Sequence, residues 1–187
     1  RRPPGSTLFP YTTLFRSSGS RFLPAAQEAF LLAFADYWNA RLEEWTAVRD
    51  SALDRRFGVN GHYLRSTPPD ALLDVTALAR VAAIKNRSQD PGLAAVDQIG
   101  GDFLQLVRYG LRDPEALLVR DSVKLLDALL RVELPAGPCW YRYSGDGYGE
   151  HPDGAAYDGT GQGRPWPLLV GERGRSEEHT SELQSRQ

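Results

Sequence analysis

The sequence predicts an all-α domain made of helical hairpins, followed by a long loop rich in glycine and aromatic residues. Three observations lead to this prediction. Apolar side chains recur at spacings of three and four in three separate stretches. Glycine, proline or a good N-cap residue separates these stretches. Beyond residue 136 the composition changes abruptly, because residues 137–174 hold more than half of the chain's 18 glycines.

The first predicted helix spans residues 25–45. Pro24 suits the first turn of a helix, where a missing N–H does no harm. Residues 29–35 are apolar nearly all round, and such a helix is normally covered on several sides. We therefore expect many neighbours around it. Its apolar face consists of Leu31, Phe34, Trp38, Leu42 and Trp45.

The periodicity lapses in the next forty residues. Glycine, asparagine and proline interrupt residues 46–69, which we interpret as a long loop carrying short strands. Long loops are often functional. Residues 71–84 have helical propensity without a distinct apolar face, and the turn-forming KNRSQDPG ends them.

Two further helices complete the predicted hairpins. One ends at Gly110, a natural C-terminal stop, and the other begins near Asp113, a good N-cap, with Pro114 in its first turn. The first has Val96, Ile99, Phe103, Leu106 and Val107 on one face, and the second has Leu118, Leu125, Leu129 and Val132.

Composition excludes several classes of partner and site. With 22 Lys and Arg against 24 Asp and Glu, the chain lacks the excess of cations that a nucleic-acid backbone requires, so no nucleic acid is expected. No apolar run reaches roughly eighteen residues, so no membrane span is expected. The single cysteine, Cys139, excludes an internal disulfide, and beside Trp140 it is expected to pack as a small apolar side chain. His62 and His151 are isolated in the sequence, so no metal site is predicted.

The segment 137–174 has the residue inventory of a sugar site. A sugar presents apolar C–H faces edged by hydroxyls, so its sites combine aromatic rings with carboxylates and arginines that form oriented hydrogen bonds. Linkers are rich in glycine and serine but poor in aromatic residues, unlike this segment. Composition alone leaves a second interpretation open, an ordered glycine-rich surface loop whose charges are solvated.

A resemblance narrows this choice. The stretch PAGPCWYRYSGDGYGEHPDGAAYDGTGQGRPWPLLVGERG closely resembles a signature of the bacterial glucoamylases, the glucan 1,4-alpha-glucosidases of glycoside hydrolase family 15, in the C-terminal part of the catalytic domain. Upstream, LEEWT, IKNR and GGDFLQLVRYGLRDPE follow in the order expected of that family. The resemblance covers residues 22–174. It implies a partial (α/α)6 barrel of helical hairpins with its active site in loops at one end, including the glycine- and aromatic-rich loop.

The resemblance also implies an activity and site residues. The family removes glucose from the non-reducing ends of α-1,4-glucans with inversion, so the expected substrate is an α-glucan or maltooligosaccharide, and no cofactor is expected. In LLVGERG, Glu172 resembles the general base. In RYSGD, Arg142 and Asp146 resemble the residues that clamp the sugar, while Tyr148 and Trp140 resemble aromatic residues that line the pocket.

The general acid has no match in this chain. The family carries it in a Trp-Glu-Glu stretch, whereas LEEWT has the reverse order, so we interpret Glu43 and Glu44 as solvated charges at a helix end. We therefore expect the acid to lie upstream, and the chain to be an inactive fragment. The open barrel would leave the first helix uncovered, which predicts poor solubility.

Both ends of the chain resemble translated sequencing adapters. The matches are TLFPYTTLFRS at residues 7–17 and RSEEHTSELQS at residues 175–185. Such segments are excluded from reasoning about the fold. We expect residues 1–17 and 175–187 to be adapter-derived and residues 18–174 to be a native fragment of a glucoamylase-like catalytic domain.

Two alternatives of different class remain open. One is another hydrolase on the same barrel, trehalase-like or glucodextranase-like, because one fold hosts several activities. The other is a non-catalytic helical module whose loop binds a glycan or a protein without turnover. A panel of substrates tested on the complete enzyme distinguishes the first alternative from a glucoamylase. The second alternative predicts that Glu172→Gln in the complete protein changes neither hydrolysis nor binding.

Overall fold

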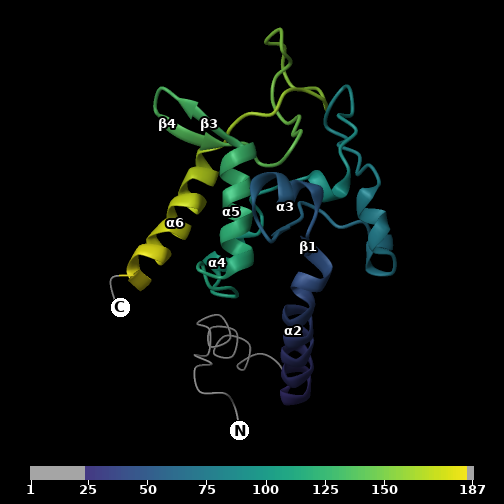
Figure 1. Ribbon diagram of the computed structural model, residues 1–187, viewed down its shortest axis with the longest axis vertical. Helices are drawn as coiled ribbons and strands as arrows, with labels where there is room; N and C mark the ends of the chain where they lie inside the picture. Colours follow the sequence, from purple (N-terminus) through teal and green to yellow (C-terminus); the bar gives the residue numbers. More distant parts are fainter. Residues whose placement is uncertain (1–23, 185–187) are drawn as a thin grey trace.

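The computed structural model describes residues 24–184, which are mostly helical and carry two small antiparallel hairpins (Figure 1). The predicted all-α class is confirmed, because helices are the main regular elements of the described residues. The helices are α2 (Ala25–Thr46), α3 (Ala52–Phe57), α4 (Leu104–Arg108), α5 (Leu117–Leu129) and α6 (Pro167–Gln184). The strands are β1 (Ala47–Arg49), β2 (Gly61–Tyr63), β3 (Arg131–Leu134) and β4 (Gly137–Trp140).

The core is built around α5. This helix packs against β2 and β3, and α6 lies against α4 and β4 (Figure 1). The hydroxyl of Ser122 accepts a hydrogen bond from the Tyr63 N–H at 2.9 Å, which ties α5 to β2. The buried apolar residues of α5 are Leu118, Val119, Leu125 and Leu126.

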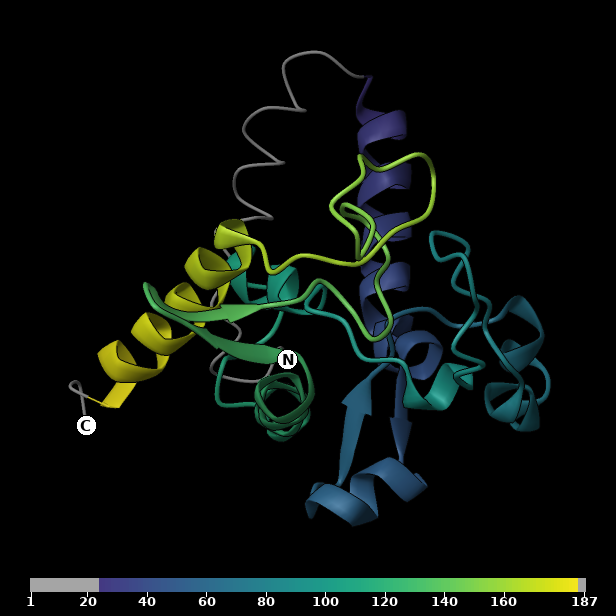
Figure 2. The ribbon, with the colours of Figure 1, turned by 90° about the horizontal axis from the view of Figure 1, so that it is seen from above.

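The first predicted helix is confirmed. The many neighbours that its apolar face predicts are absent among residues 24–184, and the exposure of the helix instead agrees with the expectation that an open barrel leaves it uncovered. No residue of α2 is buried. The helix projects away from the core around α5 in both views of the ribbon (Figures 1 and 2). Phe30 and Trp38 on this helix are 66% and 54% exposed. No described helix is both long and apolar enough to cross a membrane.

The short strands predicted within residues 46–69 are confirmed. The structure also has a short helix between them, α3, which was not predicted. β1 pairs with β2 in antiparallel register, with Val48 opposite His62. Between these strands, Ser51 and Asp54 form a reciprocal capping box that begins α3. Gly58 ends α3 with a φ of 61°, a left-handed conformation that glycine adopts without strain.

The helix predicted from Val96 to Val107 is wrong in its first half. Residues 95–97 form a 3₁₀ turn, and α4 begins only at Leu104. Gly100 instead forms an isolated antiparallel bridge with Tyr143, and the Ser144 N–H donates to the Ile99 carbonyl at 2.9 Å. This pairing takes the place of the first part of the predicted helix and brings the loop after β4 against residues 99–101.

Other boundaries also differ from the predictions. Residues 69–72 and 75–79 form 3₁₀ turns rather than one helix. α5 ends at Leu129, and Val132 pairs with Cys139 in the β3–β4 hairpin, because the turn at residues 134–137 reverses the chain. α6, which the sequence pattern does not predict, continues across Gly174 to Gln184. The N-terminal segment that resembles an adapter lies outside the described residues.

Candidate active site

Arg142 and Asp146 form the centre of the site. They lie in the loop that follows β4 and form a bidentate, or two-pronged, salt bridge. Arg142 Nε donates to Asp146 Oδ2 at 2.6 Å, and Arg142 Nη2 donates to Asp146 Oδ1 at 2.7 Å. The Asp146 side chain is 1% exposed and that of Arg142 is 31% exposed. A two-pronged pair of this kind fixes the plane of the guanidinium. The exposed part of Arg142 is therefore held in one orientation.

The buried Asp146 carboxylate is fully supported by donors. Its Oδ1 accepts from Asn86 Nδ2 at 2.9 Å and from the Tyr148 N–H at 3.0 Å. Burial alone would raise the pKa of Asp146, but the hydrogen bonds from Arg142, Tyr148 and Asn86 outweigh it and hold that pKa below its usual range. Asp146 therefore remains an anion that orients Arg142.

Asn86 is a site residue that the sequence analysis did not single out. Its Nδ2 donates to the Tyr143 hydroxyl at 2.8 Å as well as to Asp146, and its Oδ1 accepts from the Gly147 N–H at 3.1 Å. A Cβ on Gly147 would collide with the Asn86 carbonyl, so only glycine permits this approach. The available signal was IKNR, which the resemblance placed in order without assigning a role.

Aromatic rings surround the Arg142 guanidinium. Its central carbon lies 4.9 Å from the ring centroid of Tyr148, 5.1 Å from that of Trp166 and 5.3 Å from that of Tyr143. These distances are in the range of cation–π attraction. Tyr148 nevertheless keeps 44% of its surface exposed, so an apolar ring is accessible beside a fixed cation. The predicted proximity of Arg142, Asp146 and Tyr148 is present in the structure.

Glu172 lies on α6, at the edge of the same region. Its Oε1 accepts hydrogen bonds from Gln105 and, at 3.4 Å, from Arg108, both on α4. The side chain is 12% exposed. Glu172 and Arg142 line one cavity of about 310 Å³, together with Arg65, Ser66, Gly101, Asp102, Tyr143 and Leu169. The structure thus places Glu172 and Arg142 around a common space.

Comparisons with known proteins show what the chain is similar to. No family model matches the chain. A glucoamylase from Clostridium sp. (strain G0005) is 34% identical over 148 residues, which are 76% of this chain and 19% of that protein. A solved bacterial glucoamylase complexed with acarbose is 29% identical, with a TM-score of 0.63, over 78% of this chain and 20% of that one. The chain is similar to a segment of these glucoamylases. It spans about a fifth of the length of these relatives.

Trp140 lies apart from the other predicted site residues of this glucoamylase-like segment. It is 7% exposed and belongs to the core cluster around α5. Its indole N–H donates to Asp127 Oδ1 at 2.9 Å, and Asp127 also pairs with Arg173 at 2.8 Å. The structure therefore gives Trp140 a packing role that anchors β4, and no geometry that would bring it to a ligand beside Arg142.

Asp102 is a second carboxylate in the cavity lined by Glu172, and the sequence analysis did not identify it. Burial raises the pKa of Asp102, Glu172 raises it further by repulsion, and Arg65 and Arg142 oppose both effects. The cavity therefore holds two carboxylates and two arginines. Only the folded chain reveals this group, because Arg65, Asp102, Arg142 and Glu172 lie on four separate segments.

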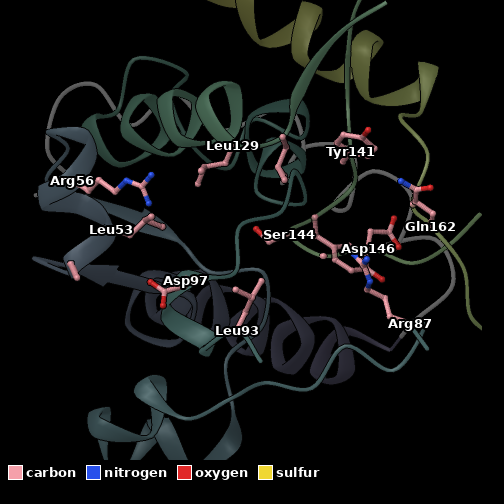
Figure 3. A pocket seen from close by; sticks show the side chains of 15 residues that line it. Leu53, Arg56, Arg87, Leu93, Asp97, Leu129, Tyr141, Ser144, Asp146 and Gln162 are labelled. Carbon is pink, nitrogen blue, oxygen red and sulfur yellow. The ribbon is translucent and has the colours of Figure 1, made fainter. Parts of the chain in front are cut away.

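A larger hollow of about 660 Å³ adjoins the Asp146 side of the site (Figure 3). Asp146, Arg87 and Gln162 lie on one side of it, and the leucines lie on the other side together with the charged side chains of Arg56 and Asp97 (Figure 3). Within residues 24–184, no group of three or more histidine, cysteine, aspartate or glutamate side chains is arranged to hold a metal ion. The site of the glucoamylase-like segment consists of hydrogen-bonding groups and rings.

Proposed function

We propose that this chain forms the sugar-holding part of a glycoside hydrolase that releases glucose from the non-reducing ends of α-1,4-glucans. The supporting observation is the two-pronged Arg142–Asp146 pair beside the exposed ring of Tyr148. The free edge of Arg142 donates to sugar hydroxyls, and the Tyr148 ring covers an apolar C–H face. The substrate is an α-glucan or a maltooligosaccharide.

The reaction that fits this site is hydrolysis with inversion. Inversion requires one carboxylic acid that protonates the leaving oxygen and one carboxylate that deprotonates the attacking water. We assign the second role to Glu172, because it shares a cavity with Arg142. Gln105 and Arg108 both donate to Oε1, and no hydrogen bond to Oε2 is found among the described residues.

The general acid belongs to the parent protein, by which we mean the longer protein that contains this chain. The chain matches about a fifth of each glucoamylase relative, so the larger part of a relative has no counterpart here. A missing general acid lowers the rate by roughly a hundred- to ten-thousandfold. The 187-residue chain on its own is therefore expected to bind sugar without hydrolysing it.

Residues 18–174 are the native part of the chain in this proposal, and the flanking segments are translated adapter sequence. Genomic DNA read across the locus tests this. The proposal requires that the native frame diverge from the present sequence before residue 18 and after residue 174. Native codons for both TLFPYTTLFRS and RSEEHTSELQS would refute it.

Binding by the chain itself tests the sugar site. Arg142→Ala is expected to weaken maltotriose binding by roughly ten- to a hundredfold, because hydrogen bonds to a charged group contribute about 1.5–3 kcal/mol. Tryptophan fluorescence follows binding, since Trp166 lies beside Arg142. Arg120→Ala, at an exposed arginine of α5, is the matched control and should change nothing. Equal affinities for the Arg142 and Arg120 variants would refute the site.

Activity of the parent protein tests the assignment of Glu172. Glu172→Gln should lower kcat by roughly a hundred- to ten-thousandfold with little change in sugar binding. Glu133→Gln, at an exposed glutamate of β3, serves as the control. If the Glu172 variant keeps the full rate, Glu172 serves only to connect α6 to α4, and the base lies elsewhere.

A further inference from the structure

Asp102 stands just before α4 and lines the same cavity as Glu172. Within residues 24–184, no group forms a hydrogen bond or an ion pair with the Asp102 carboxylate. Glu172 differs, because Gln105 and Arg108 both donate to its Oε1. Each oxygen of a carboxylate offers two lone pairs for hydrogen bonds. Since Asp102 is also exposed, its oxygens are left for water or substrate.

The two arginines of the cavity are held by other partners. Arg142 forms the bidentate salt bridge with Asp146, and Arg65 Nη1 donates to Gln98 Oε1 at 2.6 Å. Burial raises the pKa of Asp102, and the charges of Arg65 and Arg142 oppose this rise. The arginines thus favour the anionic form of Asp102 without occupying its oxygens.

Glu172 and Asp102 place two like charges beside one cavity of about 310 Å³. Repulsion by Glu172 adds to the effect of burial on the pKa of Asp102, so the two carboxylates are near enough to interact. A donor with two hydrogens bridges two acceptors and relieves this repulsion. Water has two hydrogens, whereas a sugar hydroxyl has one. The cavity exceeds the roughly 30 Å³ of one water, so the pair of carboxylates favours a bridging water.

Hydrolysis with inversion needs a water in a fixed orientation. The base takes one hydrogen of this water while the oxygen attacks the anomeric carbon. The other hydrogen must point away from the sugar, so that a lone pair faces that carbon. An oriented reactant reacts faster than one that turns freely, because its rotational entropy is lost before the reaction. A second acceptor beside the base sets this orientation.

We propose that Asp102 is this second acceptor and positions the attacking water for deprotonation by Glu172. This inference rests on the proposed function and adds a residue to it. One hydrogen of the water passes to Glu172 as the oxygen bonds to the anomeric carbon, and the bond from that carbon to the leaving oxygen breaks. The leaving oxygen takes its proton from the general acid of the parent protein. The second hydrogen stays on the new hydroxyl and remains hydrogen-bonded to Asp102.

Hydrolysis of maltotriose by the parent protein tests this role. Asp102→Ala removes the acceptor and should lower kcat by roughly ten- to a hundredfold with KM nearly unchanged, as expected for a lost hydrogen bond to a charged group. Asp102→Asn keeps an oxygen acceptor in the same place and should recover most of that loss. Asp70→Ala is the matched control, because Asp70 is exposed, pairs with Arg80 and does not line the cavity.

Sugar binding by the 187-residue chain separates a role in positioning water from a role in holding sugar. Tryptophan fluorescence should give the same affinity for maltotriose in Asp102→Ala as in the wild type, whereas Arg142→Ala weakens it. Urea denaturation of the same samples shows whether each variant is folded. A loss of affinity in Asp102→Ala as large as in Arg142→Ala would mean that Asp102 holds sugar, and the inference would be wrong.

The kinetic outcomes separate this inference from the proposed function. If Glu172→Gln is inactive while Asp102→Ala keeps the rate of Asp70→Ala, the water needs no second acceptor and only this inference fails. Equal losses in Asp102→Asn and Asp102→Ala would also overturn it, because an acceptor oxygen alone would then have no effect. If the unaltered parent protein does not hydrolyse maltotriose, the proposed function fails and the inference fails with it.

Discussion

The helices α2 and α5 are both amphipathic or apolar in sequence, yet they differ completely in burial. α5 has 13 residues, of which five are buried, whereas α2 has 22 residues and none is buried. Apolar content does not explain the difference, since α2 carries Phe30, Phe34 and Trp38. What differs is the number of elements packed around each helix. β2 and β3 pack against α5, and residues of α4 share its core cluster, whereas α2 packs mainly against β1, which directly follows it.

Polar contacts join the C-terminal half of α2 to the rest of the chain, in addition to the packing of Leu42 against the core cluster. Glu43 accepts from Arg112 through both its oxygens and from the Tyr63 hydroxyl at 2.7 Å. Arg112 also donates to the Asn39 carbonyl at 2.8 Å. The interpretation of Glu43 as a solvated charge is therefore wrong, because the ring of Tyr63 and the loop after α4 reach its carboxylate. Glu44 is exposed and pairs only with Arg41 among the described residues.

The largest effect is expected in α5. Leu125→Ala removes a side chain that is 0% exposed and leaves a cavity in the core. The free energy of unfolding should fall by about 2–5 kcal/mol, as measured by urea denaturation. Leu117, on the same helix but 56% exposed, gives the control Leu117→Ala. Equal losses for the two variants would show that the burial assigned to α5 is wrong.

The second effect tests the polar contact of α2. Glu43→Ala leaves Arg112 and the Tyr63 hydroxyl without their shared acceptor, so the free energy of unfolding should fall by about 1–3 kcal/mol. Glu44→Ala is the matched control one residue away. Its exposed pair with Arg41 contributes only about 0.3–0.5 kcal/mol. If the two losses are alike, the Glu43 contacts do not hold α2.

Acid should loosen α2 through the same carboxylate. Burial would raise the pKa of Glu43, but hydrogen bonds from Arg112 and Tyr63 outweigh it and hold that pKa below the usual 4.5. Because the folded-state pKa is lowered, the contact stabilises fully above pH 4.5, and the stabilisation is lost as the pH falls through the lower value. Amide hydrogen exchange should show α2 losing protection in this window before α5 does. In Glu43→Ala this difference in pH dependence should disappear.

The same contrast explains what the sequence could predict. The boundaries of α2 could be predicted from the sequence, because the spacing of its apolar residues and the position of Pro24 are local signals. Its apolar face alone predicted many neighbours, and only the resemblance, which implies an open barrel, predicted the exposure of α2, because burial depends on partners outside the helix. Arg142 and Asp146 are four residues apart in the sequence, and the motif RYSGD was sufficient to identify both. Asn86 and Asp102 could not be identified in this way, because their positions in the site depend on the Gly100–Tyr143 bridge, and no local pattern encodes that pairing.

The smallest effect in this chain is expected at Trp38. Its side chain is 54% exposed on α2, so Trp38→Ala should change the free energy of unfolding by no more than about 0.5 kcal/mol. In the parent protein the same substitution should cost about 3–5 kcal/mol, if other helices cover this face as a barrel of hairpins requires. Urea denaturation of both proteins gives the comparison. A negligible loss in both would mean that the face of α2 stays uncovered, and the difference between α2 and α5 would then be a property of the whole domain rather than of this segment.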